Sequence, residues 1–236
     1  MRGFGKHAGV EAVLPLRYVR GDIEFLDDSR RPLANPGGSI HHRDETLLRP
    51  SDPWLLGHAA RTAGPWTLAL RAGVTLPLGR TEENPFELGR QGLPHQHFQF
   101  GTGTWDPLVG LGAGRRFGRV NLALTGLARF VVAENGHGYR AGHRYALSLN
   151  AQRPLSSSWH LLASAEAWHE SAETWQGRLE EEGNLGRTDV LLGFGVARSL
   201  RGGGVSLSLR VPIVTRATSA HLDYPVLVSL GWSSGR

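Results

Sequence analysis

Residues 66–76 read WTLALRAGVTL, and this stretch carries the pattern that decides the fold. Every second residue from Trp66 onward is apolar, whereas the residues between them include Thr67, Arg71 and Thr75. A period of two is typical of a β-strand, because successive side chains point to opposite faces. The stretch therefore predicts a strand with one apolar face and one polar face.

The same alternation returns along the rest of the chain. The clean segments are 120–132, 144–150, 159–166, 189–196, 205–213 and 224–232, and the less regular ones are 8–19, 53–62 and 105–116. Together they predict about ten strands, within a range of ten to twelve. Most are close to the roughly 9–11 residues that a tilted transmembrane strand needs.

The connections between these segments alternate between short and long. The short links are 63–65, 117–119, 154–157 and 201–204, and the long ones are 20–51, 80–103, 133–141, 170–187 and 216–222. Short periplasmic turns and long extracellular loops are typical of outer-membrane barrels. The sequence therefore predicts an all-β fold: one antiparallel up-and-down transmembrane β-barrel over residues 1–236, with 20–51 and 80–103 as long loops.

The polar face carries charged residues, which we expect to line the lumen of the barrel. They are Arg71, Arg129, Arg144, Glu166, Asp189 and Arg210. A soluble up-and-down barrel would have the reverse polarity, apolar inside and polar outside. The charges either pair with one another and with Glu11, or select a permeant anion.

Aromatic residues near strand ends favour the membrane interpretation. They are Trp66, Tyr145, Trp159, Tyr224 and Trp232. Such residues form girdles at the two membrane interfaces. Ordinary packing of aromatic side chains is the alternative.

Composition narrows the class further. The chain has 236 residues, no Cys, a formal charge of +5 and a pI near 10.3. Its basic residues are scattered, which argues against nucleic-acid binding and leaves outer-membrane lipid or lipopolysaccharide as the anionic partner. The start, Met1–Gly5, leads into a candidate strand without a secretory signal, so the chain is a mature or truncated form, has a misassigned start, or is not exported.

Histidines in the long loops are candidate metal ligands. His95 and His97 point the same way on a strand, and His41, His42 and His58 lie elsewhere in the first quarter of the chain. Neutral imidazole binds Cu or Zn well. No HExxH motif or Cys partner is present, so ordinary polar loop histidines are the alternative and we predict no required cofactor.

Hydrolysis is a weaker hypothesis. His160, Ser164 and Glu166 have the residue types of a hydrolytic triad at alternate positions. The chain has no GxSxG elbow. We therefore predict a protein that is not an enzyme.

Short motifs suggest a family. GVTLPLG at 73–79, FGTGTWDP at 100–107, RVP at 210–212 and the closing YP…GW at 224–232 resemble segments of the meta-pathway phenol-degradation outer-membrane barrels. The likeness spans roughly residue 52 to the C-terminus, although Ser233–Arg236 lacks the terminal aromatic typical of assembly signals. The resemblance implies a bacterial outer-membrane transporter with no catalytic residues.

These observations predict passive or facilitated movement of a small solute across the outer membrane. The alternative is a closed barrel that binds a metal or a partner through its His-containing loops. A barrel-resident hydrolase is the third possibility.

Overall fold

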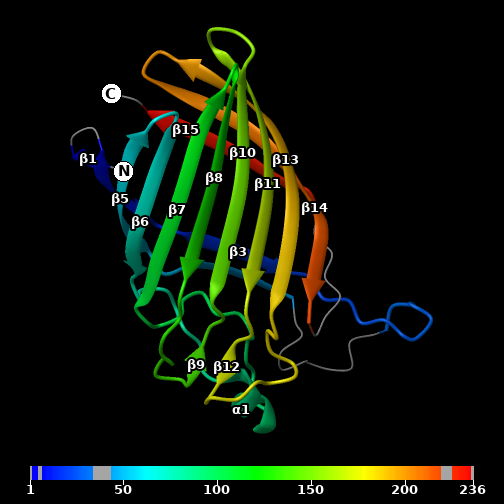
Figure 1. The fold of residues 1–236 in the computed structure, drawn as a ribbon. Helices are drawn as coiled ribbons and strands as arrows, with labels where there is room; N and C mark the ends of the chain where they lie inside the picture. Colours follow the sequence, from blue (N-terminus) through cyan, green and yellow to red (C-terminus); the bar gives the residue numbers. More distant parts are fainter. Residues whose placement is uncertain (1, 5–6, 34–43, 219–224, 235–236) are drawn as a thin grey trace.

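The computed structural model describes residues 2–4, 7–33, 44–218 and 225–234. Its main feature is one antiparallel sheet of 11 strands, in the order β1-β2-β5-β6-β7-β8-β10-β11-β13-β14-β15 (Figure 1). Within this sheet, each strand pairs with the sheet strands that precede and follow it along the chain, which is an up-and-down arrangement. The predicted all-β antiparallel fold and its strand number are therefore confirmed.

Successive strands of this sheet run in opposite directions between two ends of the molecule. They are β1 (Arg2–Phe4), β2 (Ala8–Val13), β5 (Trp54–Ala63), β6 (Trp66–Thr75), β7 (Asp106–Phe117), β8 (Val120–Arg129), β10 (Arg144–Pro154), β11 (Trp159–Glu170), β13 (Arg187–Leu200), β14 (Gly203–Ala217) and β15 (Leu227–Ser234). The sheet is curved, so that β15 runs behind β8 and β10 in Figure 1.

Short turns join strands at one end of the sheet, drawn at the top of Figure 1. Only two residues separate β5 from β6 and β7 from β8. The first residues of these turns, Gly64 and Gly118, have φ of 58° and 57°. Glycine adopts this left-handed conformation without steric cost, which makes the tight reversal accessible.

The long links lie at the opposite end, together with the only helix among the described residues, α1 (Pro85–Arg90). A two-stranded sheet of β9 (Tyr139–Arg140) and β12 (Thr174–Trp175) joins two of these links. The predicted alternation of short and long connections is thus confirmed. We call these two regions the short-turn end and the long-loop end.

Two long links contain more structure than the sequence analysis expected. The segment 20–51 was expected to be a loop. It contains the end of β3 (Leu16–Gly21) and all of β4 (Glu45–Pro50), and these two strands pair antiparallel. The segment expected as one strand at 8–19 is divided at Leu14–Pro15, because proline cannot donate to the strand ladder. Next to this division, a hydrogen bond of 3.0 Å from Ser51 N to Pro15 O extends the pairing of β3 and β4.

Helix α1 lies inside the other expected loop, 80–103. Asn84 caps it, accepting hydrogen bonds at Oδ1 from the backbone nitrogens of Phe86 and Glu87 at 3.0 and 3.3 Å. Pro85 occupies the first helical turn, where its missing N–H costs nothing. Asparagine before proline, with glutamate three positions after the asparagine, is a helix-start signal that a period of two does not reveal.

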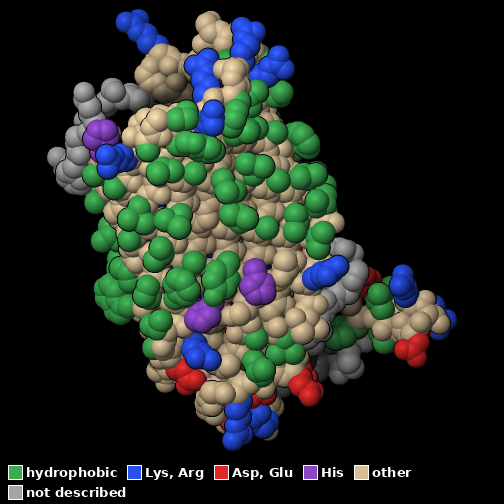
Figure 2. Space-filling view, in the orientation of Figure 1, with side chains coloured by type: hydrophobic (Ala, Val, Ile, Leu, Met, Phe, Trp, Pro, Cys, Tyr) green, Lys and Arg blue, Asp and Glu red, His purple; other side chains and the backbone are tan. Residues whose placement is uncertain are grey.

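The apolar face of the sheet points outward. Leu207, Leu147 and Leu230 have 47%, 51% and 83% of their surface exposed. Figure 2 shows hydrophobic side chains spread over the body of the molecule between its two ends. The largest cluster of buried apolar residues lies instead among the long loops, around Val131, Tyr139, Ala141 and Trp175. Among the described residues, no helix has the length and apolar character to cross a membrane.

Candidate lumen site and its loop cap

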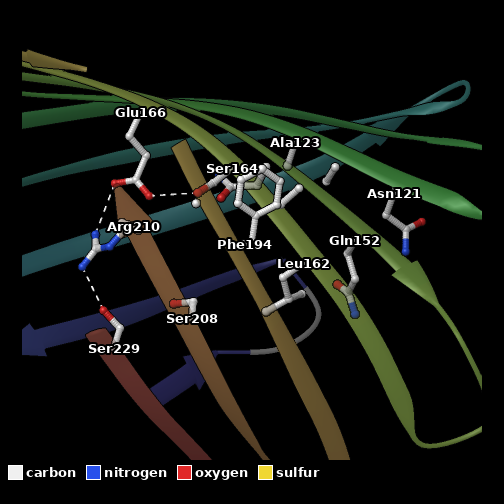
Figure 3. Close-up of a pocket in the computed structure, with 14 residues that line it drawn as sticks. Asn121, Ala123, Gln152, Leu162, Ser164, Glu166, Phe194, Ser208, Arg210 and Ser229 are labelled. Carbon is white, nitrogen blue, oxygen red and sulfur yellow. Dashed lines mark hydrogen bonds and ion pairs between the residues drawn. The ribbon is translucent and has the colours of Figure 1, made fainter. Parts of the chain in front are cut away.

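The inward face of the sheet lines an open cavity of about 420 Å³. Its lining residues come from six strands, β8, β10, β11, β13, β14 and β15, and Figure 3 shows ten of them labelled. The polar residues that line it are Asn121, Asn150, Gln152, Ser164, Glu166, Ser208, Arg210 and Ser229. Six of these eight carry a neutral amide or hydroxyl group, so the cavity presents hydrogen-bonding groups more than charge.

The two charged residues of the cavity neutralise each other. Arg210 Nη1 lies 3.2 Å from Glu166 Oε2, and Arg210 Nη2 donates to Ser229 Oγ at 2.9 Å. Ser164 Oγ donates to the other Glu166 oxygen at 3.2 Å. The pair is largely shielded from solvent, with side-chain exposures of 25% and 12%. Charges removed from water need such partners, so this network fixes both side chains.

A missing side chain makes the pair possible. Glu166 and Arg210 lie on β11 and β14, and β13 runs between these two strands. Gly193 of β13 lies opposite Ser164 on one side and Arg210 on the other. A Cβ at this position would lie 2.2 Å from Ser164 Oγ and 3.2 Å from Arg210 Cγ. Because Gly193 has no side chain, Arg210 can reach across β13 to Glu166.

The remaining predicted lumen residues are also paired, partly with groups that the sequence analysis did not name. Arg71 lies 3.9 Å from Glu11, as expected. Arg144 instead pairs with Glu170 at 2.9 Å, its direct neighbour across the β10–β11 register. Asp189 lies 2.7 Å from Arg187. The predicted lumen charges are thus distributed over separate pairs rather than one continuous ladder.

A buried polar network lies where β5, β6 and β7 meet the long-loop end. Asp52 accepts hydrogen bonds from Gly79 N at 2.8 Å and from Thr102 N and Oγ1 at 2.6 and 2.9 Å. Thr104 Oγ1 donates to Asp106 Oδ1 at 2.7 Å. These contacts tie the 80–103 segment down across the strand ends.

Arg129 belongs to the same network. It is 8% exposed, and its Nε lies 4.0 Å from Asp106 Oδ2. Asp106 itself is fully buried. The residues of this network that the lumen prediction missed are Asp52, Thr102, Thr104 and Asp106; all but Asp52 lie in the FGTGTWDP segment, which was singled out for its resemblance and not for its position.

The long loops form a packed cap. Tyr139 and Trp175 are stacked at a tilt, with ring centroids 4.8 Å apart, and Phe86 of α1 meets Trp175 edge to face at 6.2 Å. Glu173 accepts a hydrogen bond from each of the first two: its Oε2 from Tyr139 Oη and its Oε1 from Trp175 Nε1, both at 3.3 Å. Burial raises the pKa of the Glu173 carboxyl above its usual range, and burial likewise raises the pKa of Tyr139.

The candidate metal ligands His95 and His97 lie in this cap. Their ring centroids are 5.2 Å apart, and His97 packs edge to face on Phe86 at 5.3 Å. His95 is buried, with its Nδ1 2.9 Å from Leu93 O. Within the described part of the chain, no group of three or more His, Asp or Glu side chains is arranged to hold a metal ion. His41 and His42 lie outside the described residues.

The structure separates the residues considered for hydrolysis. Ser164 and Glu166 are hydrogen-bonded to each other in the cavity. His160, by contrast, has its Nε2 3.3 Å from Ser199 Oγ on the neighbouring strand. A Ser-His contact of the kind that activates a nucleophile is therefore not formed by this trio.

Compared with known proteins, the chain matches no protein-family model and no curated protein. The resemblance to the meta-pathway phenol-degradation barrels therefore stays a prediction from short motifs.

Proposed function

We propose that this chain spans a bacterial outer membrane as a closed β-barrel and lets a small polar solute pass through its lumen. The observation that carries the proposal is the polarity of the sheet. Outward residues such as Leu149 and Leu207 are apolar and about half exposed, whereas inward residues form a polar cavity. Water would penalise so much exposed apolar surface, and hydrocarbon would not.

The dimensions of the apolar face support this placement. From Trp159 at the short-turn end of β11 to His169 near its other end there are ten residue steps. At about 3.3 Å per residue they cover about 33 Å of strand, or about 25 Å along the membrane normal at a tilt of about 40°. That height equals the apolar band of outer-membrane barrels.

Aromatic side chains lie at both limits of this band. Trp66, Trp159 and Trp232 are exposed at the short-turn end, and Tyr145 stacks on His169 near the long-loop end with centroids 6.1 Å apart. Aromatic rings of this kind favour the membrane–water interface. Tyr224, which the sequence analysis also assigned to a girdle, lies outside the described residues.

Membrane insertion also requires that the sheet close. β1 and β15 are its two edge strands, and an open edge exposes unpaired N–H and C=O groups that hydrocarbon cannot satisfy. The curvature in Figure 1 brings β15 round toward the first strands. We therefore infer a barrel in which β15 meets the N-terminal strands.

The cavity indicates the class of solute. Among its polar side chains, amide and hydroxyl groups outnumber charged ones, and its one ion pair is neutral as a whole. Such a wall favours a small hydrogen-bonding solute without net charge over an anion. The earlier option of anion selectivity is therefore the weaker one.

A closed, partner-binding barrel is the second candidate function. The loop cap supports it, because α1, β9 and β12 pack around Tyr139 and Trp175 at the mouth of the barrel. A packed cap presents a defined surface to a partner and narrows the way into the lumen.

Refolding into detergent followed by gel electrophoresis with and without boiling tests the proposal. A band that shifts on boiling, together with a β-rich circular dichroism spectrum, is the expected result. Swelling of liposomes in an uncharged sugar then distinguishes the two candidates: an open lumen admits the sugar and a closed one does not. A protein that stays monomeric and soluble without detergent would refute membrane insertion.

A further inference from the structure

The short-turn end carries many positive charges and no negative ones among the described residues. Its arginines lie in the last residues of strands or in the turns: Arg61, Arg115, Arg116, Arg119, Arg153, Arg198 and Arg201. The sequence has no Asp or Glu between Asp52 and Glu82, between Asp106 and Glu134, between Glu134 and Glu166, or between Asp189 and Asp223. Those four intervals contain all the short turns from β5 to β14.

Figure 2 shows the resulting asymmetry on one face of the molecule. Blue basic side chains without red acidic ones gather at the short-turn end, whereas both colours occur at the long-loop end. Six of the seven arginines are exposed, and Arg115 is half-buried. In the described part of the chain, none of the seven lies within 4.0 Å of a carboxylate.

Four of these arginines face outward, on the apolar side of the sheet. The strand register places Arg61 opposite Leu68, Arg115 opposite Trp66, Arg153 opposite Leu161 and Arg198 opposite Trp159. Directly opposed residues share a face of the sheet, and all four neighbours are exposed apolar residues. We call Arg61, Arg115, Arg153 and Arg198 the arginine collar.

Aromatic rings hold two members of the collar in place. The Arg115 guanidinium lies 5.4 Å from the centroid of Trp66 and 4.7 Å from that of Phe117. The Arg198 guanidinium lies 5.4 Å from the centroid of Trp159. Stacking on a ring leaves the edge of the guanidinium free to donate hydrogen bonds. These side chains are therefore positioned at the interface with donors still available.

We propose that the arginine collar binds the phosphate groups of anionic phospholipids in the leaflet at the short-turn end. Guanidinium groups pair with phosphate oxygens through two parallel hydrogen bonds. The adjoining Leu68, Leu161 and tryptophan rings would contact the acyl chains and the glycerol region of the same lipid. The turn arginines, Arg116, Arg119 and Arg201, add attraction to a negatively charged surface. This inference rests on the proposed membrane insertion.

Lipid retention by the full-length refolded protein tests it. Native mass spectrometry after exchange in mixed micelles should find phosphatidylglycerol retained over phosphatidylcholine. The variant with Arg61, Arg115, Arg153 and Arg198 all changed to Gln should lose this preference. The matched control changes four exposed arginines of the long-loop end, Arg80, Arg90, Arg140 and Arg178, to Gln, which removes the same charge; it should retain the preference.

Insertion is scored separately, by the boiling shift of each protein refolded with phosphatidylcholine alone. A wild-type protein that inserts there but shows no preference for phosphatidylglycerol refutes the collar proposal and leaves the barrel proposal standing. Equal losses in the collar and control variants would also refute it, because net charge would then explain the binding. Failure of the wild type to insert refutes the barrel proposal itself.

Discussion

Arg210 reaches over Gly193 to place its guanidinium 3.2 Å from Glu166 Oε2, joining two strands that are not neighbours in the sheet. This contact ties β14 to β11 on the inner face, while β13 supplies only backbone between them. The pair therefore depends on a carboxylate, a guanidinium and the absence of a side chain between them. Each of these three requirements can be tested separately.

Replacing Glu166 by Gln should leave the Arg210 charge without its counterion. The free energy of unfolding should fall by about 2 kcal/mol, the typical contribution of a hydrogen bond to a charged group. In planar bilayers the reversal potential should move toward that of the anion, because the cavity gains a positive charge. Glu87→Gln, which breaks a pair with Arg90 whose side chains are 43% and 57% exposed, is the control at the long-loop end and should change neither quantity. An unchanged reversal potential would contradict the cavity's place on the conduction path.

Replacing Gly193 by Ala should destabilise the protein by about 1–3 kcal/mol, because the added Cβ overlaps Ser164 Oγ and crowds Arg210 Cγ. Urea unfolding of the lipid-embedded protein measures this change. Gly57→Ala provides the comparison, since its Cβ would meet only Ala72 O at an ordinary 3.7 Å. The double change of Gly193 to Ala and Ser164 to Gly should recover part of the loss. Equal effects at positions 193 and 57 would refute the steric explanation.

Replacing Asp52 by Ala should release the 80–103 segment. Three hydrogen bonds to Gly79 and Thr102 would be lost, and the buried Thr102 N would have no acceptor. The cost should be about 3 kcal/mol, because a buried donor loses its partner. Limited proteolysis should then cleave within 80–103 faster than in the wild type. Asp27→Ala, which removes comparable hydrogen bonds to Ser29 N and Arg31 N in an exposed loop, should leave that cleavage rate unchanged.

The loop cap should lose stability as the pH rises. Burial raises the pKa of Glu173 in the folded protein, so the folded cap binds a proton more tightly than the unfolded loop does. The contribution of the Glu173 proton to the stability of the cap is fully present below about pH 4.5, the ordinary pKa of the carboxyl. It is lost as the pH rises through the raised pKa of Glu173 in the folded protein. Hydrogen exchange at the Trp175 amide should therefore reveal easier opening at higher pH, after correction for the intrinsic rate.

Glu173→Gln should remove this pH dependence, because the glutamine side chain still offers an oxygen to accept the hydrogen bond from Trp175 Nε1 but has no proton that titrates. Glu182→Gln, at an exposed position of the same loop, should retain it. The explanation fails if both variants follow the wild-type pH profile.

The sheet could be predicted from sequence because a strand with one apolar and one polar face alternates apolar and polar residues along the chain. Trp66–Thr75 shows this clearly, and the two-residue turns at Gly64 and Gly118 add local signals. The partners of the charged residues predicted to line the lumen were harder to predict, because they depend on strand register. Arg144 meets Glu170 only once β10 and β11 are aligned residue by residue.

The cap could not be predicted in the same way. Tyr139 and Trp175 are far apart in sequence, in segments without periodicity, and they meet only because two separate loops converge. The one local signal, Asn84–Pro85 with Glu87, marks α1 but not what α1 packs against. The Asp52 network likewise joins residues from distant parts of the chain, such as Asp52 and Thr102.

The position of the aromatic cluster in the loops has a consequence for how the molecule unfolds. Tyr139 and Trp175 pack against loop residues, whereas the strands are joined by the hydrogen bonds of their backbones. Two parts with such different sources of cohesion need not melt together. The part of the near-ultraviolet circular dichroism that comes from those rings should therefore be lost at a lower temperature than the far-ultraviolet signal of the strands. The species observed between the two transitions would have a folded sheet and an unfolded loop cap.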